Sequence, residues 1–248
     1  MRRMPHWFAV GLAAAVMLLP AVARAQSVSI NLGHPGGASA TAGIVQLMAL
    51  TTVLSLAPSL LVIGTAFTRI IIVLSLLRGA MGTQGAPPNA VLVGLALFLT
   101  WFVMAPVLEQ AWRQGIVPMD AGTVSTMQGL RLAAAPFHRF MAQHLRPADA
   151  RLFLSLGHMA PPKTLDAMPW RALVPAFLVG ELRRAFEMGF LLYLPFLAID
   201  LVVASVLMSL GMMMLPPNLV SLPFKLLFFV LVDGWRLLAG SLIRSFTG

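Results

Sequence analysis

The chain has 248 residues, of which 59% are hydrophobic and only 10% are charged. Because a soluble domain carries about 25% charged residues, this composition excludes an ordinary soluble domain and indicates a membrane protein. The net charge of +9 does not indicate a nucleic-acid-binding protein, since the basic residues are scattered and form no stripe. The absence of cysteine excludes disulfides, thiolate metal sites and cysteine nucleophiles.

Residues 1–25 predict a secretory signal peptide. Arg2 and Arg3 form a basic start, residues 7–19 are apolar, and Ala23-Arg24-Ala25 provides the small residues of a cleavage site. An uncleaved anchor helix is the alternative, which the short apolar run disfavours. Residues 26–43 are rich in Gly, Ser, Ala and Asn and are expected to form a flexible N-terminal segment.

Residues 44–108 predict a first helical hairpin with spans at about 44–66 and 89–108. Each span reaches the length of roughly 20 apolar residues that crosses a bilayer. The apolar pattern of the first span continues to Arg78, before a turn that is rich in glycine and proline. We expect Pro106 to mark the end of the second span, because proline removes a helical hydrogen bond.

Residues 109–171 are richer in charge and predict a periplasmic helical segment. Apolar residues recur at spacings of three and four from Met127 to Leu145, which gives one apolar helical face. Pro136 is expected to weaken or split this helix, and Pro147 to end it.

Residues 172–248 predict a C-terminal helical hairpin with helices at about 187–213 and 219–243. Pro216 and Pro217 are expected to form the turn between them.

The distribution of charge conflicts with a simple topology. If the leader is cleaved, Arg69 lies in the cytoplasm as the positive-inside rule expects, whereas Arg184 and Arg236 lie outside. A charge at the centre of a span costs about 2.5–3.5 kcal/mol, and a leucine or isoleucine returns only about 0.3–0.6 kcal/mol. The final helix carries Lys225, Asp233 and Arg236. We therefore expect the C-terminal hairpin to be buried among protein helices in an assembly, not exposed to lipid.

Three pairs of charges can neutralise themselves on one helix. Arg183 precedes Glu187 by four residues, Glu181 precedes Arg184 by three, and Asp233 precedes Arg236 by three. The last two pairs are singled out. These four residues are candidates for a structural or gating role.

Asp200 and Arg69 have no such local partner. A carboxylate in the apolar run around Asp200 must find a partner across helices or subunits, or be protonated. Lys225 and Arg69 are the candidate partners. A structural pair between helices is the simplest interpretation, and a proton relay or a gating element are the alternatives.

Four methionines, Met208, Met212, Met213 and Met214, precede the proline turn. Methionine is unbranched and adaptable, so it fills irregular space and repacks easily. Three consecutive residues cannot all face one core, because successive helical residues point about 100° apart. In a ring of subunits this segment could form a soft apolar plug. Filling a membrane core is the alternative.

No enzyme or metal motif is present in the sequence. A Walker loop, an H-E-x-x-H motif and a G-x-S-x-G elbow are all missing. The five histidines lack metal-ligand spacing. We therefore expect no catalytic, cofactor-binding or metal-binding residues.

Several long blocks of sequence resemble a known family. The first begins at Phe67 with FTRIIIVLSLLR and continues through GTQ and PPN, and GLALFLT follows. The C-terminal third contains PFLAID, the methionine segment 208–217, PFK and DGW. Together these blocks resemble the FliP family of flagellar biosynthetic proteins over roughly residues 44–243.

This resemblance implies a pore-forming subunit of the flagellar type III export gate, in the inner membrane and the flagellar basal body. Members of the family form a ring with FliQ and FliR, through which unfolded flagellar subunits pass. Their methionine-rich loop lines and seals the pore, and it corresponds here to Met212, Met213 and Met214. The alternatives are the equivalent subunit of a virulence injectisome and a proton- or ion-conducting channel subunit in which Asp200 titrates.

The sequence as a whole predicts an all-α membrane protein. Four hydrophobic helical segments form two hairpins, a small helical soluble segment lies between the hairpins, and the chain assembles into a ring.

Overall fold

The computed structural model describes residues 62–247 except Gln84 and Met213, together with five isolated positions before residue 62. The described part is helical and contains no strand. Its helices belong to one compact unit, Leu56–Gly248. The predicted signal peptide, the predicted flexible segment and most of the first predicted span lie outside the described residues.

The order of the helices is α3 (Phe67–Met81), α4 (Asn89–Ala111), the π-helical turn η1 (Trp112–Ile116), α5 (Val117–Asp120), α6 (Thr126–Gln143), α7 (Pro147–Leu156), the 3-10 turn η2 (Leu165–Ala167), α8 (Trp170–Ser209), α9 (Pro217–Leu231) and α10 (Gly234–Thr247).

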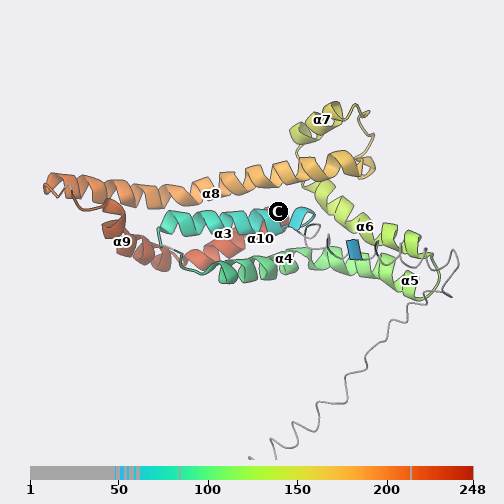
Figure 1. The fold of residues 1–248 in the computed structure, drawn as a ribbon, viewed down its shortest axis with the longest axis horizontal. Helices are drawn as coiled ribbons and strands as arrows, with labels where there is room; N and C mark the ends of the chain where they lie inside the picture. Colours follow the sequence, from blue (N-terminus) through green and yellow to red (C-terminus); the bar gives the residue numbers. More distant parts are fainter. Residues whose placement is uncertain are drawn as a thin grey trace, which may run out of the picture. The chain divides into compact units, whose positions relative to one another are not determined.

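The core forms around α3, which packs along α8 on one side and against α4 on another (Figure 1). Ile70, Val73, Leu74 and Leu77 of α3 are buried there, spaced three and four residues apart as one helical face requires. The approach of α3 to α8 is close, because a Cβ atom at Gly189 would lie 2.2 Å from Leu76 Cδ1.

Two described helical segments are long and apolar enough to cross a membrane. One is α8, with 40 residues, and the other is the continuous stretch Asn89–Asp120 of 32 residues that α4, η1 and α5 form together. Helices α9 and α10 reach that length only as a pair, and they are bent by 63°. The described part therefore has two or three candidate spans, and the arrangement of four segments as two hairpins in a ring stays a prediction.

The predicted end of the second span at Pro106 is wrong. Pro106 and Pro136 both lie inside helices, α4 and α6 respectively, and neither ends or splits its helix. Proline is tolerated inside an apolar helix such as α4 because packed neighbours satisfy the freed backbone group. Pro147 starts α7 at its first turn, where its missing N–H has no helical partner to lose.

The C-terminal helices also differ from the predicted bounds. The helix expected at 187–213 begins at Trp170, because the charges that interrupt the apolar run pair along the helix and do not break it. Arg183 Nε, for example, donates to Glu187 Oε1 at 2.8 Å.

The helix expected at 219–243 is broken in two at Val232 and Asp233. Asp233 has a φ of 53°, a left-handed conformation that aspartate tolerates better than most residues. The next residue is glycine, and a Cβ atom at Gly234 would lie 2.2–2.7 Å from atoms of the Phe229 ring. The bend lets α10 return against α4.

Replacing Gly115 with alanine should destabilise the chain by about 1–3 kcal/mol, as overpacking does. The added Cβ would lie 2.5 Å from the Ala133 backbone nitrogen and 2.6 Å from the Gly129 carbonyl oxygen, so η1 and α6 would have to separate. Gly94→Ala is the matched control, because nothing lies within 4 Å of its added Cβ, and it should stabilise α4 by about 0.5–1 kcal/mol. Thermal unfolding in detergent would measure both, and equal shifts would contradict the packing.

Candidate functional site

Arg69, near the start of α3, forms a buried ion pair with Glu181 of α8. The Arg69 guanidinium donates from Nε to Glu181 Oε2 at 2.8 Å and from Nη2 to Glu181 Oε1 at 2.5 Å. The two side chains are 1% and 0% exposed. This two-pronged geometry is the strong form of an arginine–carboxylate contact, and we call the pair the Arg69–Glu181 node.

The same arginine also binds the end of α10. Its Nη1 donates to the carbonyl oxygen of Ser245 at 3.0 Å and to the Ser245 hydroxyl at 2.8 Å, and its Cζ lies 3.7 Å from the centre of the Phe246 ring. His144 Nε2 donates to the Phe246 carbonyl oxygen at 3.2 Å. Basic groups near a helix C-terminus satisfy its last carbonyls, so Arg69 and His144 fix α10 against the body of the protein.

Asp200 of α8 pairs with Lys225 of α9. Lys225 Nζ donates to Asp200 Oδ2 at 2.7 Å and to the carbonyl oxygen of Ala80 in α3 at 3.1 Å. Ser221 donates its hydroxyl to Asp200 Oδ1 at 2.5 Å. The side chains are 5% exposed for Lys225 and 28% for Asp200. This Lys225–Asp200 node joins the consecutive helices α8 and α9 to α3, which is distant from them in sequence.

The two ion pairs singled out within single helices are present, and they differ in how far their side chains are exposed to solvent. Arg184 Nη1 lies 3.6 Å from Glu181 Oε1, so the buried carboxylate faces a second arginine. Arg236 Nη1 lies 3.6 Å from Asp233 Oδ2, and these side chains are 85% and 63% exposed. An exposed pair of this kind contributes about 0–1 kcal/mol, which leaves the two nodes as the strong electrostatic contacts.

Sequence reasoning therefore identified one partner and missed the other. Lys225 was a predicted partner of Asp200, and the structure brings the two together. The partner of Arg69 is Glu181, which the sequence pattern assigned only to Arg184. His144, Ser221 and Ser245 were missed, because short-range spacing carries no signal for contacts between distant helices.

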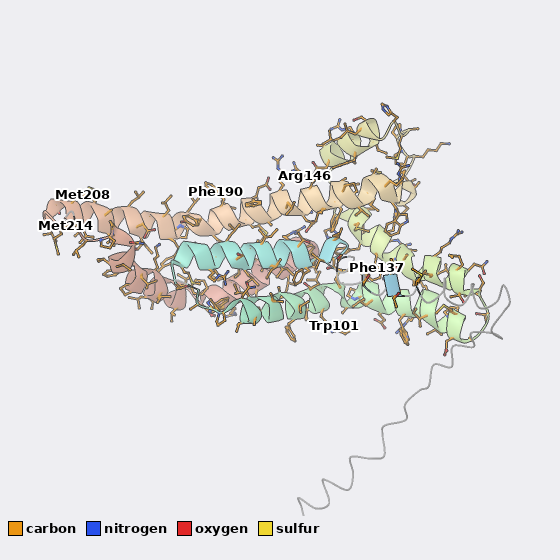
Figure 2. All side chains as sticks on the ribbon, in the orientation of Figure 1. Trp101, Phe137, Arg146, Phe190, Met208 and Met214 are labelled. Carbon is orange, nitrogen blue, oxygen red and sulfur yellow. The ribbon has the colours of Figure 1, made fainter. Side chains whose placement is uncertain are left out.

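The methionine segment lies at the tip of the turn between α8 and α9. Figure 2 shows Met208 and Met214 at the end of α8 farthest from α6 and α7. Met208 and Met212 are exposed, and Met214 is 98% exposed. Met213 lies outside the described residues. The described methionines of this segment therefore present much of their flexible apolar side chains outward.

Among the described residues, no group of three or more His, Asp or Glu side chains could hold a metal ion. The charged residues instead connect helices, and the apolar residues at the tip of the hairpin are exposed.

These features define a class: a helical protein with apolar segments able to span a membrane, whose helices are joined by buried ion pairs. Residues 50–242 match the FliP family, and the chain belongs to that family. Membership implies a component of flagellar type III protein export.

The chain is similar to several proteins named flagellar biosynthetic protein FliP. It is 54% identical to the Caulobacter vibrioides protein over 235 residues, which cover 94% of this chain and 88% of the relative. It is 47% identical to the Bacillus subtilis protein over 217 residues, 88% of this chain and 98% of the relative. It is 45% identical to the Rhizobium meliloti protein over 235 residues, 94% of this chain and 96% of the relative.

Proposed function

We propose that the chain is a pore-forming subunit of the flagellar type III export gate. In this proposal several copies form a ring with FliQ-like and FliR-like membrane proteins in the inner membrane, at the flagellar basal body. The ring passes unfolded flagellar subunits and performs no catalysis. Residues 1–25 act as the signal peptide, and residues 109–171 form the periplasmic helical segment.

The observation that carries the proposal is the exposed methionine segment. Met212 and Met214 are exposed at the tip of the α8–α9 turn, where an isolated membrane protein gains nothing from apolar side chains. In a ring, the same segment from each copy would meet at the centre. Because methionine repacks easily, the segments would pack against one another when the pore is empty. They would pack around a passing chain of any sequence when it is occupied.

The length of α8 also supports an assembly. At 1.5 Å per residue, its 40 residues extend about 60 Å, roughly twice the 30 Å hydrocarbon thickness of a bilayer. Only 11% of its most apolar 18-residue window is buried within the chain. Hydrocarbon of that thickness covers only about half of the length of α8, so we assign part of the remaining exposed surface to neighbouring subunits.

The two nodes would then serve as structural charges in this ring. The Arg69–Glu181 node fixes α3 and α10 on α8, and the Lys225–Asp200 node fixes α9 on α8. Holding these helices in place would set the position of the methionine tip. Arg184, Asp233 and Arg236 would contribute little beyond neutralising nearby charge.

The alternative of a proton- or ion-conducting channel depends on titration of Asp200. Both oxygens of that carboxylate already accept hydrogen bonds, from Lys225 and Ser221 of α9, so Asp200 has a structural role in joining α8 to α9. Asp200→Asn should therefore lower the level of folded protein and the amount of export together, in proportion. Export assays normalised to protein level would measure this, and a loss of proton flux at unchanged protein level and export would support the channel.

The direct test of the assembly is co-purification. A full-length tagged chain, extracted in mild detergent, should bring down FliQ-like and FliR-like proteins at a mass that contains several copies of the chain. Recovery of a monomer without these partners would contradict the proposal.

A further inference from the structure

An apolar cavity of about 750 Å³ lies between α4, α6 and the start of α8. Its lining includes Leu97, Trp101 and Met104 of α4, Phe137 of α6 and Trp170 of α8. Figure 2 shows Trp101 and Phe137 on their respective helices. The volume lies within the roughly 300–1,000 Å³ of ligand-binding pockets, and both tryptophans are exposed.

A second, more polar cavity of about 480 Å³ adjoins the first. The two share Ala134 and Trp170 among their lining residues. Arg131 and Arg139 line the second cavity with one carboxylate, Asp166, so its fixed charges are positive on balance. Arg131, Ala135 and His138 of this lining recur at spacings of four and three on one face of α6, and Ala134 and Arg139 lie on either side of that face.

We propose that these joined cavities bind one anionic phospholipid. An acyl chain would occupy the apolar cavity, and the phosphate of the headgroup would lie between Arg131 and Arg139. The cavities lie where two candidate spans meet the charged segment 109–171. Tryptophan is enriched at membrane–water interfaces, and basic pockets beside spanning helices bind anionic headgroups. The combination of an apolar chamber and an adjacent cationic one fits a phospholipid better than either a hydrocarbon or a free phosphate.

This inference does not depend on the proposed pore, so the two can fail separately. The test uses the full-length chain, stripped of lipid in detergent and then mixed with palmitoyl-oleoyl-phosphatidylglycerol or with the phosphatidylcholine of the same acyl chains. Native mass spectrometry would count the bound lipid. We expect phosphatidylglycerol to bind more tightly than phosphatidylcholine.

The double variant Arg131→Gln/Arg139→Gln should weaken phosphatidylglycerol binding by about 30-fold, roughly fivefold for each arginine near a headgroup, and should leave phosphatidylcholine binding unchanged. The matched control is Arg113→Gln/Arg151→Gln, because it removes the same charge from exposed arginines that line neither cavity. Ala134→Leu fills the junction between the cavities and should weaken the binding of both lipids. Circular dichroism would verify that each variant keeps its helix content.

Three outcomes would overturn the proposal. Equal loss of phosphatidylglycerol in both arginine variants would show general attraction to a basic surface. Glycerol phosphate that binds as tightly as phosphatidylglycerol would show recognition of phosphate alone. Wild-type protein that binds neither lipid would show that the cavities are not a phospholipid site.

Discussion

Replacing Glu181 with glutamine is expected to destabilise the folded chain by about 3–5 kcal/mol, the usual result of removing one partner from a buried ion pair. Arg69 is 1% exposed, so its charge would remain in the interior without a counter-ion. Arg184, 3.6 Å from the same carboxylate, would add a second unbalanced charge nearby. Since folded domains are stable by about 5–15 kcal/mol, denaturant unfolding in detergent and the steady-state protein level should both fall sharply.

Glu187→Gln is the matched control for this prediction. It makes the same chemical change on the same helix. Glu187 pairs with Arg183 at 2.8 Å, but both side chains are exposed, so the free energy of unfolding should change little. Replacing both buried partners, with Arg69→Met and Glu181→Leu together, should recover much of the stability lost in Glu181→Gln, because the fully buried charge is gone and Arg184, 32% exposed, keeps access to solvent. Glu181→Gln that unfolds like Glu187→Gln would show that the node does not hold the fold.

Replacing Met212, Met213 and Met214 together with alanine should make the inner membrane several-fold more permeable to small ions once the gate is assembled. The substitution removes the flexible apolar side chains that would close the centre of the ring. Folding should change little, because Met212 and Met214 are both exposed. Ion-selective electrodes or a growth assay at high salt would measure the leak.

Two controls separate a seal from a general defect. Leucine at the same three positions keeps apolar volume and should leak less than alanine. Met127→Ala removes an exposed methionine from α6 and should not leak. Permeability that is the same in all variants and in the wild type would contradict a sealing role for the methionine segment.

The sequence predicted the helical class well because that class depends on composition and local periodicity. A run such as Phe67 to Leu77 contains almost nothing that could cover a soluble core, and the structure makes it a helix with a buried face. Boundaries were less predictable. The charged residues from Glu181 to Glu187 indicated that the helix begins only at about residue 187. The i,i+3 and i,i+4 ion pairs instead keep these residues inside α8.

The contacts of the site were only half accessible from sequence. The isolated Asp200 in an apolar run demanded a partner, and few candidates existed, so Lys225 could be named. Glu181 already had a neighbour at helical spacing, which hid its stronger contact with Arg69 across 112 residues. The break at Asp233 was missed because the apolar pattern does not reveal that Asp233 takes a left-handed φ of 53° or that the Phe229 ring packs beside Gly234.

Cross-linking of a substrate in transit tests the central claim, a pore closed by the methionine segment, most directly. The chain has no cysteine, so Met214→Cys provides a single reactive thiol at the tip of the hairpin. An export substrate with one cysteine, stalled by a folded fusion at its C-terminus, should form a disulfide with Met214→Cys and not with the exposed control Arg113→Cys. Cross-links at neither position, or equal cross-links at both, would contradict the account.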